Sequence, residues 1–370
     1  MAQRTRSHSK SFCSGFLRVP RRAFSRPAPH THNSKGGGEM EQGFWMILQL
    51  FGGAALFLYG MDTLTGALQQ AAGEKLRRVL ARLTGSPLAG VLTGAVVTAV
   101  LQSSSAVTVL VLSLVSAGLL PLQRAVPVVF GANIGTTVTA QLLAFQLEDA
   151  RWLLLFVGLV LWFAGRGALH AGGQALLAFG LLFEGIAVMA GALEPLATGP
   201  VFRQWMEAVQ HRPGLGLLAG LGMTLAVQSS SATIAVLQRI AAQPGPESGC
   251  LLSLAGAIPV LLGDNIGTTV TAVLASVGQG RDAKRLAAAH TLFNLSGAAV
   301  CWLLLPQFTA LVQLVSPTEP AGEVLARQIA NAHTLFNVCC TLLWLPFTPW
   351  MVRIVCALVP GKPPKTPPLD

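Results

Sequence analysis

The sequence predicts an all-α polytopic membrane protein with two inverted-topology repeats, each containing a re-entrant helical hairpin and a broken transmembrane helix, plus one extra C-terminal span. Composition is the first reason: the 370 residues are 52% hydrophobic and only 11% charged, and their mean hydropathy is +0.59. Soluble proteins have about 25% charged residues. The second reason is a polar signature that occurs twice in apolar surroundings, as Gln102–Ala106 and as Gln228–Ala232. Polar segments at corresponding positions of two halves of a membrane protein indicate a transport site.

The net charge of +10 comes mainly from residues 1–39, which hold eight basic residues and one acidic residue. The rest of the chain is close to balanced, so the charge does not predict nucleic-acid binding. Residues 1–39 contain no long apolar run of the kind found in a secretory signal, and we expect a disordered basic extension. A transit peptide and an extension upstream of a natural start at Met40 are alternatives that the sequence leaves open.

The chain divides into two predicted repeats and a C-terminal part. Each repeat contains, in order, an apolar crossing, a hairpin of two short arms, a crossing broken by a polar motif, and a further crossing. The predicted segments of repeat 1 (40–170) are 44–70, a hairpin with arms 88–101 and 106–119, 122–147 and 151–168; those of repeat 2 (171–306) are 172–192, a hairpin at 213–242, 250–278 and 285–305; an additional transmembrane helix at 323–352 and a short cytoplasmic tail at 353–370 follow.

The length of the arms is the reason to expect hairpins. The arms 88–101 and 106–119 have 14 residues each. A helix of that length spans about 21 Å at 1.5 Å per residue, which is less than the ~30 Å of the hydrocarbon core. Two such arms that meet at a polar tip are expected to enter and leave the membrane on the same side.

The number of crossings predicts that the two repeats are inverted. Three crossings in each repeat place the start of repeat 2 on the side of the membrane opposite to the start of repeat 1. With residues 40–43 outside, twelve basic residues fall in cytoplasmic loops and five fall outside, in agreement with the positive-inside rule. We therefore expect a multi-pass protein of the cell (inner) membrane.

The two Gln-Ser-Ser-Ser tips are candidate anion sites. A helix that begins at such a break presents free backbone N–H groups and the positive end of its dipole, and hydroxyls and a carboxamide add donors without formal charge. Small residues also allow close helix packing in membranes, an alternative that two identical blocks in matching apolar arms make weaker. The candidate phosphate-binding residues are Gln102, Ser103, Ser104, Ser105, Gln228, Ser229, Ser230 and Ser231.

A second motif, Gly-x-Asn-Ile-Gly-Thr-Thr followed by Val-Thr, comes after each tip, at Gly131–Thr139 and at Gly263–Thr271. Its glycines are expected to let the helix unwind and free backbone carbonyls, and its oxygens suit a hard cation such as Na⁺. Asp264 adds a negative charge where the first copy has Ala132, and an ionisable residue inside a membrane is a candidate functional group. A glycine kink that only shapes the helix is the alternative. The candidate Na⁺ ligands are Asn133, Thr136, Thr137, Asp264, Asn265, Thr268 and Thr269.

Other polar residues in apolar sequence are weaker indications of a functional site. The hexapeptide Ala-His-Thr-Leu-Phe-Asn occurs twice, with His290 and His333 at its second position. Proton transfer by these histidines is one interpretation, and packing against the broken helices is the favoured one. Asp62 and Glu184 lie in apolar segments, where a place on the pathway and a structural hydrogen bond are equally compatible with the sequence. The six cysteines form no Cys-x-x-Cys pair, so neither a disulfide framework nor a metal site is expected.

The four motif blocks, in this order, resemble the type II sodium-phosphate cotransporter family, including its bacterial members, over about residues 40–353. The resemblance implies inverted repeats, a phosphate site where the two Gln-Ser-Ser-Ser tips meet, and Na⁺ sites formed by the tips and the nearby unwound helices. Many bacterial members carry a soluble C-terminal domain that resembles the phosphate-regulatory protein PhoU. This chain is expected to be a bacterial-type member without that domain.

Motifs and resemblance together predict a sodium-coupled inorganic phosphate symporter. The chain is expected not to be an enzyme and to need no cofactor, with Na⁺ as the coupling ion. Its expected partners are phosphate, Na⁺ and the lipid bilayer, and homo-oligomer formation stays open. Three alternatives remain: a transporter of another oxyanion such as sulfate or arsenate, a membrane-embedded serine hydrolase, and a non-transporting phosphate sensor. The hydrolase would need a base near a tip serine, which His290 or His333 would have to supply through the fold.

Overall fold

The computed structural model describes residues 37–82, 85–144, 150–198, 200–243, 250–316 and 321–361, which are helical with short connections. Two compact units are distinguished, Met1–Gly43 and Phe44–Asp370, and the candidate site lies in the second. Nearly all of the predicted disordered extension at 1–39 lies outside the described residues. So does the end of the predicted cytoplasmic tail, from residue 362 on.

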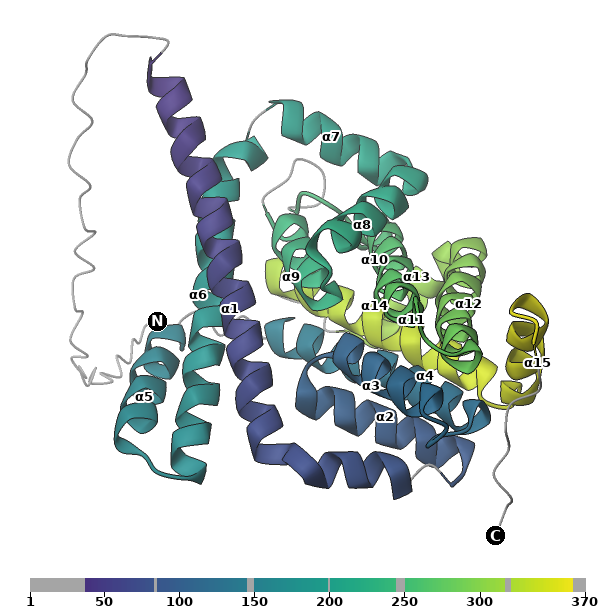
Figure 1. The fold of residues 1–370 in the computed structure, drawn as a ribbon. Helices are drawn as coiled ribbons and strands as arrows, with labels where there is room; N and C mark the ends of the chain where they lie inside the picture. Colours follow the sequence, from purple (N-terminus) through teal and green to yellow (C-terminus); the bar gives the residue numbers. More distant parts are fainter. Residues whose placement is uncertain are drawn as a thin grey trace, which may run out of the picture. The chain divides into compact units, whose positions relative to one another are not determined.

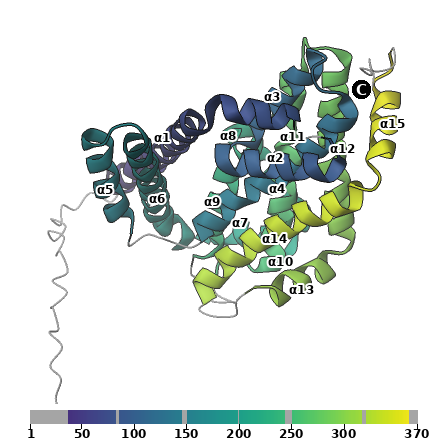
Figure 2. The same cartoon turned by 90° about the horizontal axis from the view of Figure 1, so that it is seen from below.

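Fifteen helices occupy the described residues (Figure 1). In both views α14 runs alongside α4 and α10 within the second unit (Figures 1 and 2), and it packs against both of them. The helices are α1 (Gly37–Arg82), α2 (Pro87–Leu101), α3 (Ser104–Ser116), α4 (Leu122–Ala144), α5 (Arg151–Ala164), α6 (Ala168–Thr198), α7 (Pro200–His211), α8 (Pro213–Val227), α9 (Ser230–Ala241), α10 (Leu254–Gly267), α11 (Thr269–Ser276), α12 (Arg281–Leu303), α13 (Leu305–Leu314), α14 (Ala321–Trp344) and α15 (Thr348–Leu358).

Both predicted hairpins are present as pairs of short helices. α2 and α3 meet at Gln102, and α8 and α9 meet at Gln228. Among the described residues, these two glutamines are the non-glycine positions with positive φ, at 52° and 58°, a backbone conformation that is uncommon for residues with a side chain. The next residue, Ser103 or Ser229, caps the second helix of its hairpin. The chain therefore turns at the same residue in both copies.

Glycines bring each hairpin into backbone contact with the helix that carries its second motif. A Cβ on Gly94 of α2 would lie 2.0 Å from the carbonyl oxygen of Val128 in α4. A Cβ on Gly220 of α8 would lie 1.9 Å from the carbonyl oxygen of Val260 in α10. Small residues at helix interfaces allow such close approach inside membranes. The duplicated sequence thus folds into duplicated packing.

The first copy of the Gly-x-Asn-Ile-Gly-Thr-Thr motif does not break its helix, contrary to the prediction. α4 passes through the motif as one continuous helix. In the second copy α10 and α11 are separated only by Thr268, which keeps a helical backbone with φ −58° and ψ −26°. The motif glycines serve close approach instead, because a Cβ on Gly131 would lie 1.9 Å from the carbonyl oxygen of Val91 in α2.

The span predicted at 151–168 is wrong in length. α5 has 14 residues, about 21 Å of helix, and a turn with Gly167 at φ 58° leads into α6. α5 packs along α6, and a Cβ on Gly158 would lie 2.3 Å from the backbone nitrogen of Leu177. Among the described helices, α1, α4, α6, α10 with α11, and α12 are long and apolar enough to cross a membrane. Repeat 2 thus has its three predicted crossings, whereas repeat 1 has two. The number of crossings therefore does not support the inversion, and the inverted topology of the repeats stays a prediction.

The helix predicted at 323–352 is two helices rather than one. α14 ends at Trp344, and α15 begins at Thr348 with a bend of 87° between them. Pro346 lies in the connection, where it has no N–H to continue the hydrogen-bond ladder. If the bent pair counts as one span, the candidate crossings among the described helices number six.

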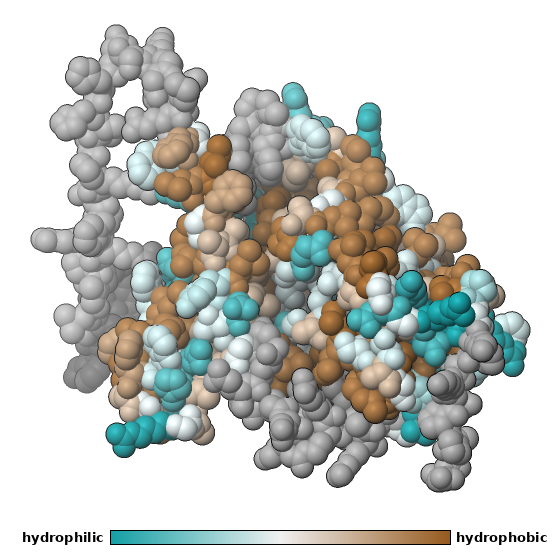
Figure 3. Space-filling model, in the orientation of Figure 1, coloured by the Kyte–Doolittle hydropathy of each residue, from teal (hydrophilic) through white to brown (hydrophobic). Residues whose placement is uncertain are grey.

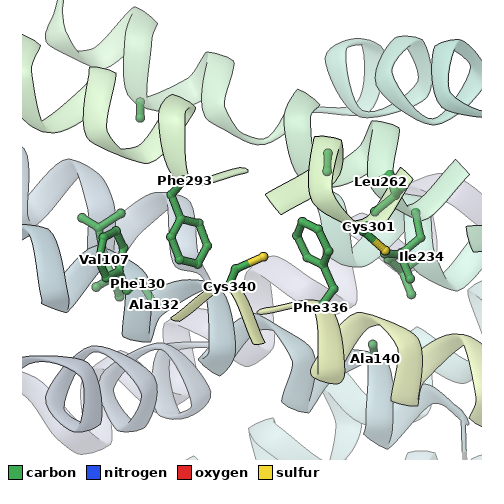
Figure 4. Packing of buried hydrophobic residues seen from close by; sticks show 14 of the residues in the cluster. Val107, Phe130, Ala132, Ala140, Ile234, Leu262, Phe293, Cys301, Phe336 and Cys340 are labelled. Carbon is green, nitrogen blue, oxygen red and sulfur yellow. The ribbon is translucent and has the colours of Figure 1, made fainter. Parts of the chain in front are cut away.

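Much of the exterior of the second unit is apolar, as expected of a protein surrounded by lipid. Large apolar side chains lie on its surface, among them Leu303, 79% exposed, and Phe163, 76% exposed. Figure 3 shows hydrophobic residues, in brown, spread over much of one face. In the interior the rings of Phe130 and Phe293 stack with their centroids 4.6 Å apart, and Figure 4 shows this pair in the buried cluster that also contains Phe336.

Gly220→Ala is expected to destabilise the protein, because the new Cβ would meet the carbonyl oxygen of Val260 and overpacking costs about 1–3 kcal/mol. Gly222→Ala in the same helix is the matched control, since nothing lies within 4 Å of a Cβ at that position and alanine favours helix over glycine by ~1 kcal/mol. Thermal unfolding in detergent measures both variants. Equal losses of melting temperature would contradict the contact between α8 and α10.

Candidate functional site

Each tip glutamine is bonded to the second motif of its own repeat. The Thr139 hydroxyl donates to Gln102 Oε1 at 2.6 Å, and the Thr271 hydroxyl donates to Gln228 Oε1 at 3.4 Å. The Nε2 group of each glutamine donates to a carbonyl oxygen in the preceding helical turn. Thr139 and Thr271 hold the same position in the two motif copies, so the tip and the motif form one connected unit in each repeat.

The first serine of each tip caps the second helix of its hairpin. Ser103 Oγ accepts from the N–H of Ala106 at 3.2 Å, and Ser229 Oγ accepts from the N–H of Ala232 at 3.3 Å. Each cap satisfies one of the free N–H groups at the start of a helix. The helix N-terminus predicted at each tip is therefore confirmed, and the hydroxyl hydrogen of each capping serine can still donate to a ligand.

The two tips differ in exposure. The second and third serines are half-buried in the first copy (Ser104, Ser105) and buried in the second copy (Ser230, Ser231). The glutamines show the opposite order, since the first is buried and the second is exposed. In this conformation the serines of the first tip are the more accessible set.

The motif threonines donate their hydroxyl hydrogens to carbonyl oxygens of their own helices. Thr136 and Thr137 do so at 3.1 Å and 2.8 Å, and Thr268 and Thr269 do so at 2.6 Å and 2.7 Å. The oxygen of each hydroxyl keeps its lone pairs, so these side chains can still accept a hydrogen bond or bind a cation. Because the helices continue through the motif, the structure offers side-chain oxygens in place of the freed carbonyls that were predicted.

Asp264 is fully buried and accepts a hydrogen bond from a threonine hydroxyl. Thr224 Oγ1 donates to Asp264 Oδ1 at 2.6 Å and lies 3.1 Å from Thr233 Oγ1. Asp264 Oδ2 has no hydrogen-bond partner among the described residues. Burying a charged group is costly unless it is paired. A cation or a proton is therefore needed to compensate this carboxylate.

The first repeat has the same framework without the carboxylate. Ala132 stands at the position that corresponds to Asp264. Thr98 corresponds to Thr224, and its buried hydroxyl has no partner among the described residues. The two halves therefore share their packing and differ in charge.

Two side chains from outside the motifs reach the motif asparagines. His290 Nε2 in α12 lies 3.0 Å from Asn133 Oδ1 in α4, and Asn337 Nδ2 in α14 donates to Asn265 Oδ1 in α10 at 3.4 Å. These contacts agree with the packing interpretation of the duplicated hexapeptide. The hydrolase alternative would need a histidine at a tip serine, whereas the Nε2 atom of His290 meets Asn133.

The two acidic residues of the apolar segments have different surroundings. Glu184 of α6 forms an ion pair with Arg151 at the start of α5, with Nε and Oε2 2.9 Å apart. Asp62 lies on the exposed side of α1. Glu184 thus has a charged partner within 2.9 Å, and both of its interpretations, a structural hydrogen bond and a place on the pathway, stay predictions.

No hydrogen bond between the two tips is found among the described residues, where the bonds of each tip stay within its own repeat. The repeats are linked elsewhere, because Gln238 Nε2 in α9 donates to the carbonyl oxygens of Ala140 in α4 and Ala326 in α14, at 3.2 Å and 3.1 Å. A joint phosphate site between the tips stays a prediction.

The sequence alone did not identify the threonines that bond to the tip glutamines, or the threonine that bonds to the carboxylate of Asp264. Thr139 and Thr271 end the duplicated motif, and Thr98 and Thr224 each stand four residues before a tip glutamine. Aligning the two halves of the chain would have found both pairs, because each pair occupies corresponding positions. The partners of the motif asparagines carried a weaker signal, since the hexapeptide repeat does not follow the spacing of the main repeats.

Paired helical hairpins, each bonded to a polar motif on a membrane-length helix, define a membrane transporter with two related halves. The chain belongs to the Na+/Pi-cotransporter family, whose model matches residues 56–191 and again residues 185–327. The double match agrees with the duplication seen in the motifs and in the packing. The resemblance to sodium-phosphate cotransporters is therefore confirmed.

Relatives of the chain carry names of several kinds. The uncharacterized protein YqeW of Bacillus subtilis is 36% identical over 309 residues, which are 83% of this chain and 96% of that protein. YjbB of Escherichia coli, whose name proposes inorganic phosphate export, is 27% identical over 320 residues, which are 86% of this chain and 56% of that protein. Sodium-dependent phosphate transport protein 2B of Homo sapiens is 35% identical over 107 residues, which are 28% of this chain and 16% of that protein. No solved structure gives a significant match.

Thr224→Val is expected to destabilise the protein, because it leaves both oxygens of buried Asp264 without a hydrogen-bond partner. An unsatisfied buried polar group costs about 1–3 kcal/mol, and a charged one costs more. Thr98→Val is the matched control, since the hydroxyl that it removes has no partner among the described residues, and we expect a neutral or slightly stabilising effect. Thermal unfolding in detergent distinguishes the two. A greater loss for Thr98→Val would contradict the role of Thr224.

Proposed function

We propose that the protein is a secondary active transporter that carries inorganic phosphate across the cell membrane together with Na⁺. The observation that carries this proposal is the repeated unit of tip and motif. In each half a glutamine with a left-handed backbone conformation is bonded to a motif threonine. The helix that follows this glutamine begins with a serine cap. Membership of the Na+/Pi-cotransporter family supports phosphate as the cargo and sodium as its companion.

The tips suit an oxyanion that must be bound and released. A helix N-terminus carries roughly half a positive charge, and the serine hydroxyls add donors without a fixed charge that would retain the anion. Each glutamine Nε2 has two hydrogens, and one of them remains after the bond to its own helix. The proposed phosphate ligands are the two sets Gln102, Ser103, Ser104, Ser105 and Gln228, Ser229, Ser230, Ser231.

The second motifs suit Na⁺ because they present oxygens whose hydrogens are already used. The threonine hydroxyls donate inward to their helices, and Asp264 keeps one oxygen without a partner among the described residues. Hard cations prefer such oxygen ligands. The proposed Na⁺ ligands are Asn133, Thr136, Thr137, Asp264, Asn265, Thr268 and Thr269.

Coupling to Na⁺ follows from electrostatics. A phosphate dianion that enters a membrane site made of neutral donors moves against an inside-negative potential. Each positive charge carried inward gains about 2.3 kcal/mol per 100 mV. Sodium ions bound first therefore offset both the charge of the anion and the unfavourable potential. The tips then bind and release phosphate without chemical reaction, so we propose a transporter with no enzymatic step.

Other transport functions differ from the proposed one in the direction of transport or in the anion that is carried. One relative is named for phosphate export and another for sodium-dependent phosphate transport. Neutral donors also fit sulfate and arsenate. For this chain we propose symport of phosphate with Na⁺ by a multi-pass protein of the cell (inner) membrane, and the direction of transport is left to the experiment.

Purified protein in proteoliposomes is expected to accumulate radiolabelled phosphate when an inward Na⁺ gradient is imposed, and to do so poorly when K⁺ replaces Na⁺. Excess unlabelled sulfate or arsenate measures the choice of anion. Loading the vesicles with phosphate and reversing the gradient measures the capacity for export. Uptake that is unchanged without Na⁺ would contradict the coupling, and phosphate binding without flux would indicate a sensor.

Ser104→Ala and Ser230→Ala are each expected to raise the phosphate KM by about tenfold or more, because a hydrogen bond to a charged group contributes about 1.5–3 kcal/mol. Ser113→Ala is the matched control: Ser113 lies in the same helix as Ser104, is exposed and donates to the carbonyl oxygen of Val109. Size-exclusion profiles and melting temperatures verify folding. Normal kinetics in both tip variants would show that the tips are packing elements.

A further inference from the structure

The duplicated hexapeptide Ala-His-Thr-Leu-Phe-Asn lies at the centre of the second unit. One copy is in α12 and the other is in α14, and both helices pack against α4 and α10, which carry the second motifs. Figure 4 shows the phenylalanines of the two copies, Phe293 and Phe336, within the buried cluster. The histidine and asparagine side chains of both copies are buried as well. Buried polar groups need hydrogen-bond partners, and each copy finds one of its partners in a second motif.

Each copy reaches the asparagine of a different motif. From α12, His290 Nε2 lies 3.0 Å from Asn133 Oδ1. From α14, Asn337 Nδ2 donates to Asn265 Oδ1 at 3.4 Å. Asn133 and Asn265 correspond to each other in the two repeats. His290 is the second residue of its hexapeptide and Asn337 is the sixth, so the two copies make equivalent contacts from positions one helical turn apart.

The contacted atom is the amide oxygen, which is the atom that would bind a cation. Such an oxygen has two lone pairs. A donor that occupies one of them fixes the direction of the other and the rotation of the amide. Asn133 depends on this donor, because its Nδ2 has no partner among the described residues. Asn265 is held on both sides, since its Nδ2 also donates to the carbonyl oxygen of Leu261 at 2.9 Å.

We propose that His290 and Asn337 are positioning residues for two unequal cation sites. Each donates to one motif asparagine and directs the second lone pair of its amide oxygen toward the ion. This inference rests on the proposed function, since it takes Asn133 and Asn265 as Na⁺ ligands. The site at Asn133 has only neutral oxygens in its motif, whereas the site at Asn265 has the adjacent carboxylate of Asp264. Loss of His290 should therefore weaken Na⁺ binding more than loss of Asn337.

The test measures sodium dependence and phosphate dependence separately in proteoliposomes. For His290→Ala, the Na⁺ concentration for half-maximal uptake is expected to rise about tenfold, which corresponds to ~1.4 kcal/mol, while the phosphate KM at saturating Na⁺ changes less than twofold. His290→Gln retains an N–H donor and is expected to recover most of the loss. Asn337→Leu, which removes the donor at nearly constant volume, is expected to raise the half-maximal Na⁺ concentration about threefold.

His333→Ala is the matched control, because His333 holds the position of His290 in the other hexapeptide, whereas the donor to Asn265 in that copy is Asn337 and no hydrogen bond of the His333 ring to a motif asparagine is found among the described residues. It is expected to change the half-maximal Na⁺ concentration less than twofold. Equal shifts for His290→Ala and His333→Ala, or a failure of His290→Gln to recover sodium affinity in folded protein, would overturn the positioning role. If His290→Ala does not fold, His290→Gln and Asn337→Leu decide: the proposal requires near-normal sodium affinity in the first and the threefold shift in the second.

The wild-type protein separates this inference from the function on which it rests. Uptake that is independent of Na⁺ in the wild type would overturn both. Sodium-dependent uptake in the wild type that keeps the same half-maximal concentration in His290→Ala would overturn the positioning role and leave the proposed transport intact.

Discussion

The backbone contact between each hairpin and its motif helix is the constraint on which the rest of the structure depends. Gly94 and Gly131 let α2 and α4 touch, and Gly220 and Gly263 do the same for α8 and α10. At this separation a tip glutamine can reach a threonine of the motif, and the capped helix begins directly after that glutamine. A side chain in either contact would move the tip away from the motif without altering any polar residue. The small residues of these helices are thus part of the site, although none of them bears its chemistry.

The two halves use the same packing to present different electrostatics. Thr224 and Asp264 form a bonded pair in the second half, where the first half has Thr98 and Ala132. A buried carboxylate with an unpartnered oxygen attracts a cation far more strongly than neutral oxygens do. Duplication therefore supplies the shared geometry of the two halves, and one substitution between them makes their charge unequal. If both motifs bind Na⁺ as proposed, the half with the carboxylate is expected to bind its cation more tightly.

The parts of the fold that the sequence predicts well are those determined by chain length and polarity. Two 14-residue apolar arms around a polar tip admit few arrangements, and the hairpins were found at the expected places. Glycine is harder to interpret, because the same residue permits unwinding and close approach, and at Gly131 close approach is what occurs. The short α5 depends on a turn at Gly167 and the bend after α14 on Pro346, both local features within long apolar stretches. The hydrogen bonds of Thr139 and Thr271 to the tip glutamines were not predicted from the sequence, because they depend on the three-dimensional contact between each hairpin and its motif helix.

Polar cross-links indicate which helices move together. Gln141 in α4 donates to Asn331 and Thr334 in α14, at 3.0 Å each, and Gln238 joins α9 to both of these helices. Breaking such bonds away from water is costly, so the hairpins, α4, α10, α12 and α14 are expected to stay together as one body. α1 and α6 supply most of a separate apolar cluster around Phe57 and Ile186, and apolar contacts can slide where polar cross-links cannot. If the protein transports phosphate as proposed, alternating access is expected to move the cross-linked body, with both tips and both motifs, against α1 and α6.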